Sequence, residues 1–131
     1  MNHYVLNFST KKIKISFSLL YIIIFFFLSY RNCLSFEVEE VVDGLFVHFG
    51  KQEDSNTVNK GDIANIGFII GSKSIAVIDT GGTPEIGKSL KKKIKKISKL
   101  PISHIIITHS HPDHFFGTQE LINNNTIVLG H

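Results

Sequence analysis

Three histidines and an aspartate gather within six positions of the 131-residue chain: His109, His111, Asp113 and His114. Neutral imidazole is the commonest protein ligand for zinc and also suits iron and manganese, and a carboxylate adds a hard oxygen. The cluster directly follows an apolar run, and side chains two residues apart at the end of a strand can converge on one ion. The residue types and spacing therefore favour parts of two adjacent metal sites. Chance clustering is the alternative, and nucleophilic catalysis by Ser110 is a weaker rival because no strained elbow motif surrounds it.

Three strands are predicted upstream of the cluster. Alternating apolar residues in "GLFVHFG" (44–50) predict a strand with one buried face, on which we expect His48 to point to the surface rather than bind a metal. Residues 50–62 are polar without a period and predict a loop, either mobile padding or a lid over a site. The β-rich runs "IANIGFII" (63–70) and "SIAVID" (74–79), joined by "GSKS", predict a hairpin.

A helix is predicted to begin at Thr83 and Pro84. Threonine is a natural N-cap, and proline suits the first helical position because the N–H that it lacks would have no partner there. Its apolar stripe, at steps of three and four residues, is Ile86, Leu90, Ile94, Ile97 and Leu100. The seven lysines on its other faces are Lys88, Lys91, Lys92, Lys93, Lys95, Lys96 and Lys99. A solvated outer face is the ordinary reason for such a surface, and binding of an acidic membrane or partner is the alternative.

The rest of the chain predicts a strand at 101–108, a loop that carries the cluster, a short helix at 117–123 and a strand at 126–131. His104 is expected to be structural. The runs "IAVI" and "HIII" are apolar at consecutive positions, which is typical of strands buried on both faces. The predicted helices can cover one face of such a sheet. Nothing else in the chain can cover the second face, so we expect a layer to be missing.

Residues 1–35 have the organisation of a signal peptide. Basic residues in "KKIK" precede an uncharged apolar run at 15–30, and Cys33 and Ser35 place small residues where a signal peptidase reads. Cleavage is expected near Ser35, with an uncleaved N-terminal anchor as the alternative. Cys33 is the one cysteine, so no internal disulfide can form. We therefore expect a periplasmic or secreted protein, or one anchored in the membrane through this leader.

The net charge of +3 belongs to the leader. From Phe36 onward, ten lysines stand against eleven acidic residues. This balance argues against a nucleic-acid partner. Contact with a membrane is expected only through the leader, if it is retained.

The segment at 108–114, "THSHPDH", resembles the metal-binding signature of the metallo-β-lactamase-fold superfamily, Thr-His-x-His-x-Asp-His. The segment at 76–82, "AVIDTGG", resembles the strand and aspartate that precede the first helix in the same superfamily. The run "NKGDIANIGFIIG" (59–71) further resembles its exported subgroup, the quinoprotein relay system metallohydrolases, which are related to a sulfur-oxidation-associated hydrolase. The resemblance implies an α/β fold in which residues 36–131 form the N-terminal half of an αββα sandwich, cut short.

The resemblance also implies a role for each residue of the cluster. His109 and His111 would bind the first metal, and Asp113 and His114 the second, with Asp113 also counted as catalytic. Asp79 would lie behind these ligands and steady the histidine segment. The expected metal is Zn²⁺, two per complete site, with iron or manganese as alternatives. A metal-bridged hydroxide would attack a small thioester, lactone or ester, because metal binding lowers the pKa of water to about 7.

Members of the family need a further histidine and a bridging aspartate downstream of this cluster. His131 follows a predicted strand where the family often has a non-ligand histidine, so we do not expect it to supply a ligand. The leading hypothesis is an exported metallohydrolase of which this chain alone is incomplete and inactive. The alternatives are a mononuclear iron persulfide dioxygenase, which shares the fold and the first two histidines, and a truncated metal-binding fragment without turnover.

Overall fold

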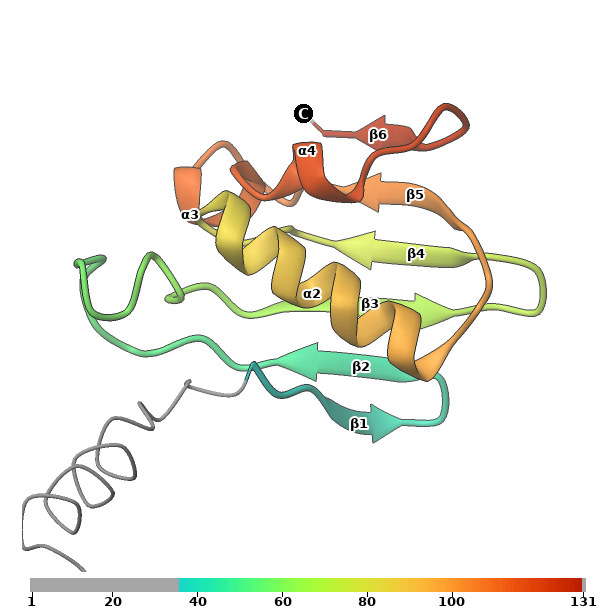
Figure 1. The fold of residues 1–131 in the computed structure, drawn as a ribbon, viewed down its shortest axis with the longest axis horizontal. Helices are drawn as coiled ribbons and strands as arrows, with labels where there is room; N and C mark the ends of the chain where they lie inside the picture. The colour runs from blue at the N-terminus through green and yellow to red at the C-terminus, as the bar shows by residue number, and fades with distance from the viewer. Residues whose placement is uncertain (1–35, 131) are drawn as a thin grey trace, which may run out of the picture. The chain divides into compact units, whose positions relative to one another are not determined.

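A computed structural model describes residues 36–130 of the chain (Figure 1). The predicted signal peptide and His131 lie outside these residues. The strands are β1 (Glu39–Val42), β2 (Leu45–His48), β3 (Ile66–Ile70), β4 (Ile75–Ile78), β5 (Ile102–Ile106) and β6 (Ile127–Leu129). The helices are α2 (Pro84–Ile97), α3 (Pro112–Phe115) and α4 (Thr118–Leu121). Within the described range, no helix is both long enough and apolar enough to cross a membrane.

The strands form one six-stranded mixed sheet in the order of the sequence, β1 to β6. Neighbours from β1 to β4 are antiparallel, and the predicted hairpin of β3 and β4 is confirmed. β4, β5 and β6 are parallel. Parallel neighbours require a crossover connection, which α2 provides between β4 and β5. The mixed α/β fold expected from the sequence is therefore present.

The crossover helix α2 begins where its capping residues predict. Thr83 Oγ1 accepts a hydrogen bond from Ile86 N at 3.4 Å, and Pro84 occupies the first turn. Ile86, Leu90 and Ile94 of the predicted stripe are buried. The stripe is shorter than predicted, because the helix ends at Ile97, whose side chain is 41% exposed.

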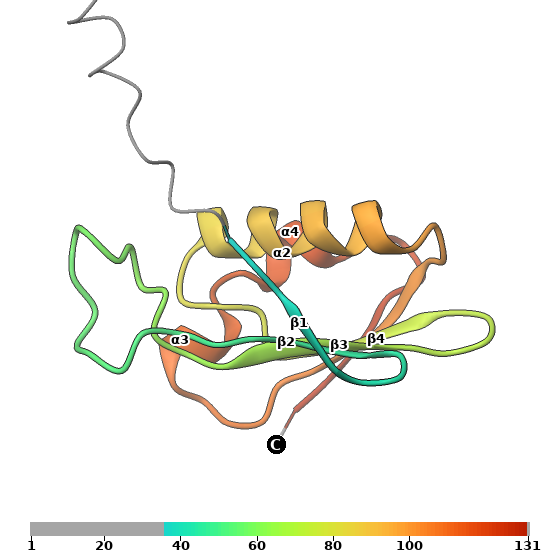
Figure 2. The same ribbon diagram turned by 90° about the horizontal axis from the view of Figure 1, so that it is seen from below.

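The core lies between α2, α4 and one face of the sheet, as Figure 2 shows. Its fully buried side chains include Phe68, Val77, Leu90, Ile105 and Leu121. The opposite face carries Ile69, which is 45% exposed, and other exposed apolar side chains. No element of the described part of the chain covers that face, as the consecutive apolar residues of the inner strands predicted.

Three expectations from the sequence were wrong or incomplete. β1, with the sequence "EEVV", was not predicted, because all four of its residues are exposed and show no alternation. The cluster was expected in a loop, but Pro112–Phe115 form a helical turn with proline in its first turn. His48 was expected at the surface and is buried, with 7% of its surface exposed, because Phe36 stacks on its ring and Asp62 hydrogen bonds to it.

Candidate metal centre

The predicted site residues lie at the edge of the sheet where β4 and β5 end. Asp79 follows β4 directly, and Thr108 and His109 follow β5. The two strands are parallel neighbours, with Ile78 beside Ile106 in the register. Their carboxyl ends therefore meet, which is the edge where open α/β sheets place their binding sites.

Asp79 connects the two strand ends through its side chain, which is buried with 3% exposed. Oδ1 accepts a hydrogen bond from Thr108 N at 2.8 Å, and Oδ2 accepts from Thr108 Oγ1 at 2.8 Å. His114 Nδ1 lies 2.7 Å from Oδ2. Because the carboxylate only accepts, a neutral His114 carries its proton on Nδ1 and keeps the lone pair of Nε2 for a metal. Asp79 thus makes the contacts that its predicted steadying role requires, while the role itself stays a prediction.

The turn that carries His114 is also held by backbone contacts with the segment after Asp79. Thr80 N donates to His114 O at 2.7 Å, and Gly117 N donates to Gly81 O at 2.9 Å. A Cβ atom at Gly117 would lie 2.0 Å from Thr80 O, so this approach requires glycine. The sequence did not predict Thr80 and Gly117 as structural supports of the site. Their signal in the sequence is only that they lie close to Asp79 and His114, in "DTGG" and "HFFG".

The structure brings the four predicted ligands together around His109. Its ring centroid lies 4.6 Å from that of His111 and 4.0 Å from that of His114. His109 Nε2 and His111 Nδ1 are 3.1 Å apart, and Asp113 Oδ2 lies 3.3 Å from His114 Nε2. The four side chains thus lie close together, and their division between two metal ions stays a prediction.

The side chains at the site are of types that bind zinc, but too few of them come together to hold one ion. Imidazole nitrogen and carboxylate oxygen are zinc ligands, and structural or catalytic zinc takes at least three protein ligands. Among residues 36–130, no group of three or more histidine, cysteine, aspartate or glutamate side chains is arranged to hold a metal ion. The metal role of His109, His111, Asp113 and His114 therefore stays a prediction, and the described residues form at most a partial site.

The remaining histidine of the sheet lies apart from this cluster. His104 is on β5, where its Nδ1 lies 2.9 Å from Ser103 Oγ. Ser103 Oγ in turn donates to Ser74 Oγ at 2.8 Å. These contacts belong to the end of the β3–β4 hairpin, so His104 takes no part in the candidate centre.

Comparison with known proteins gives relatives for this geometry. The family described as the metallo-beta-lactamase superfamily matches residues 59–131. The alkyl/aryl-sulfatase BDS1 of Saccharomyces cerevisiae is 34% identical over 70 residues, which are 53% of this chain and 11% of that protein. The linear primary-alkylsulfatase of a Pseudomonas species is 29% identical over 58 residues, 44% of this chain and 11% of that protein. The chain thus matches only a small part of the length of either relative.

Solved structures agree on the fold. The inverting sec-alkylsulfatase Pisa1 from Pseudomonas has a TM-score of 0.54 and 26% identity over 70% of this chain and 14% of its own. The mono-zinc form of the metallo-β-lactamase FIM-1 from Pseudomonas aeruginosa has a TM-score of 0.57 over 72% of this chain and 41% of its own, and its 19% identity shows the fold alone. The family match covers more than half of the chain, including the strand ends and the histidine cluster: the chain belongs to the metallo-beta-lactamase superfamily.

Proposed function

We propose that this chain carries half of the metal centre of an exported metal-dependent hydrolase. One observation carries the proposal: three histidines and an aspartate, side chains of metal-ligating types, meet where β4 and β5 end, and buried Asp79 contacts His114 among them. The named relatives are alkylsulfatases and metallo-β-lactamases, which are hydrolases. The substrate we propose is a small thioester, lactone or other activated ester.

In this proposal, side chains of the chain hold the metal ions and orient the ligands. His109 and His111 would hold one zinc ion, and Asp113 and His114 a second. When bound, zinc supplies a nucleophilic hydroxide near neutral pH and polarises the bond under attack. Asp79 keeps the His114 ring turned toward the ion, which preserves ligand basicity. Two ligands for each ion are too few for a stable catalytic site, so we propose that the chain alone is inactive.

Sulfate esters are a second candidate substrate class. The relative that is 34% identical is named an alkyl/aryl-sulfatase, and the match covers 53% of this chain. A sulfate ester needs the same metal-activated water as a carboxylic ester, so the residues of the half-site do not distinguish the two. Assays of a complete enzyme should therefore include an alkyl sulfate beside a thioester and a lactone.

The proposed location and partners follow from the leader and the charge. Residues 1–35 are proposed to direct export to a periplasm or out of the cell, or to remain as an anchor. The proposed partner is a small-molecule substrate, without nucleic acid. Mass spectrometry of the mature N-terminus tests this proposal, and exported protein that still begins at Met1 would contradict cleavage near Ser35.

A metal titration of the purified chain tests the half-site. We expect Co²⁺ to bind with the absorption bands of imidazole ligands, and His109→Ala or His111→Ala to weaken binding by about tenfold or more. His104→Gln is the matched control, because this histidine lies on β5 outside the cluster. Equal Co²⁺ binding by the wild type, the cluster variants and the control would contradict the proposal. Iron in the purified protein together with oxygen uptake would favour the persulfide dioxygenase.

A further inference from the structure

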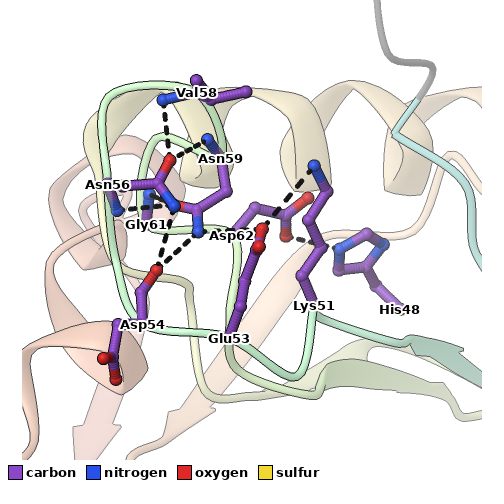
Figure 3. A network of polar contacts seen from close by, with 9 residues as sticks. All are labelled: His48, Lys51, Glu53, Asp54, Asn56, Val58, Asn59, Gly61 and Asp62. Carbon is purple, nitrogen blue, oxygen red and sulfur yellow. Dashed lines mark hydrogen bonds and ion pairs between the residues drawn. The ribbon is translucent and has the colours of Figure 1, made fainter.

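The β2–β3 loop, residues 50–62, is held by its own polar contacts (Figure 3). Asn59 has 3% of its surface exposed, and its Oδ1 accepts hydrogen bonds from Asn56 N at 2.9 Å and Gly61 N at 3.0 Å. Its Nδ2 donates to Asp54 O at 2.8 Å and to Glu53 Oε1 at 3.1 Å. The side-chain amide of Asn59 therefore uses both lone pairs and both protons. These contacts favour an ordered segment over mobile padding.

The end of this loop lies one glycine away from the candidate metal centre. Thr83 Oγ1 donates to Lys60 O at 3.1 Å. A Cβ atom at Gly82 would lie 2.6 Å from Gly61 O and 3.2 Å from the Cα atom of Asp113. Gly82 is thus packed between the loop and the turn that carries the predicted ligands of the second metal. A displacement of the loop at Gly61 would free space beside Asp113.

The loop is joined to the sheet by the buried side chain of His48 on β2. His48 Nδ1 lies 2.7 Å from the carbonyl oxygen of Glu37, and Nε2 lies 2.6 Å from Asp62 Oδ1 (Figure 3). The ring of Phe36 stacks on the imidazole, with 3.9 Å between ring centroids. Both ring nitrogens thus face oxygen atoms, and the imidazole bridges the segment before β1 and the end of the loop.

Apart from Asp62, the charged side chains around His48 are paired with other groups. Asp62 of the loop supplies the negative charge that faces the ring. Glu37, whose carbonyl faces Nδ1, has its side chain paired with Lys93 of α2. Lys51 donates from its backbone N–H to Asp62 O at 2.9 Å, while its ammonium group lies 4.0 Å from Glu53. The carboxylate of Asp62 is therefore directed at His48 rather than at Lys51.

We propose that His48 is a positioning residue for the metal centre. It fixes the β2–β3 loop through Asp62, and the loop in turn fixes Gly82 and the turn with Asp113. Removal of the imidazole takes away the contact with Asp62 and loosens the loop. The anchoring of the loop stands on its own contacts, and only its consequence at the metal centre rests on the proposed function.

Hydrogen exchange of the metal-free 131-residue protein tests the anchor. We expect amides of the loop in His48→Gln to lose about tenfold in protection relative to wild type at the same pH, as for a lost hydrogen bond to a charged group, while α2 keeps its protection. His104→Gln should behave as wild type. Unchanged loop protection in His48→Gln would overturn the proposal.

A second variant, Asp62→Ala, decides the outcome if His48→Gln fails to fold, because it removes the carboxylate from the same contact. We expect it to show the same loss of loop protection with α2 unchanged. Wild-type loop protection in Asp62→Ala would overturn the proposal.

Co²⁺ titration separates this inference from the proposed function. We expect His48→Gln to weaken Co²⁺ binding by up to about tenfold, the lower end of the loss for an outer-sphere partner. Wild-type Co²⁺ affinity in a variant whose loop exchanges faster would overturn the positioning role. Loss of loop protection in His48→Gln, together with a wild type that binds no Co²⁺, would contradict the proposed function and leave the anchor supported.

Discussion

Replacement of Asp79 by alanine tests whether one buried carboxylate organises the candidate metal centre. The side chain accepts hydrogen bonds from Thr108 N and Thr108 Oγ1 and faces His114 Nδ1, all within 2.8 Å. The backbone of Asp79 is in the left-handed region, with φ of 55°. The substitution therefore removes an acceptor from three donors and places alanine in a conformation that it disfavours.

The expected loss of stability follows from these contacts. A buried donor left without a partner costs about 1–3 kcal/mol, and alanine at positive φ costs about 1–2 kcal/mol. The hydrogen bonds are partly exposed to solvent, so water can replace some of them, and we expect the free energy of unfolding to fall by about 3 kcal/mol. Asp79→Asn should cost about half as much, because asparagine tolerates the left-handed region and keeps one side-chain oxygen.

Two assays separate the effect of Asp79 on stability from its effect on metal binding. Urea unfolding, monitored by far-ultraviolet circular dichroism, measures stability, and Co²⁺ titration measures the half-site. We expect Asp79→Ala to weaken Co²⁺ binding by about 10–100-fold and Asp79→Asn to fall between it and wild type. A change in unfolding free energy below about 1 kcal/mol would refute the contribution assigned to these bonds. Reduced stability with unchanged Co²⁺ affinity would show that Asp79 supports the fold and not the metal centre.

Two further substitutions test the supports around the site. Gly117→Ala should lower the free energy of unfolding by about 3 kcal/mol or more in urea, because its methyl group would lie 2.0 Å from Thr80 O; a near-neutral result would show that the turn can move away. Thr83→Ala should lower it by about 1 kcal/mol through loss of the helix cap, and Thr83→Ser should retain most of that stability. Equal losses for the two Thr83 variants would show that the hydroxyl is not what stabilises α2.

Local signals in the sequence predicted the elements that position the site. Thr83 and Pro84 mark the start of α2 because a helix cap depends only on neighbouring residues. The hairpin of β3 and β4 was equally visible, since its turn is short and its strands are rich in branched apolar residues. The family resemblance placed Asp79 behind the histidine segment, and the structure puts both at the ends of the parallel strands β4 and β5.

Contacts between distant residues account for what the sequence did not reveal. The burial of His48 depends on Phe36, which precedes it by twelve positions, and on Asp62, which follows it by fourteen. The close approach of Gly117 to Thr80 joins segments on either side of α2. Neither contact leaves a periodic pattern in the chain, and a histidine between two apolar residues, Val47 and Phe49, looks the same in the sequence whether its side chain is covered or open.

The open face of the sheet and the incomplete ligand set have one physical consequence in common. Ile69, Ile106 and Leu129 are exposed on the strands, and an apolar surface of this kind favours association with another layer. The candidate metal centre lies at the edge of the same sheet, and no group of three or more possible ligands within the described residues is arranged to hold a metal ion. A layer packed on the open face would bury these side chains, and its loops at the carboxyl edge would reach the donors. Such a layer should therefore raise both the stability of the sheet and the affinity of the centre for metal.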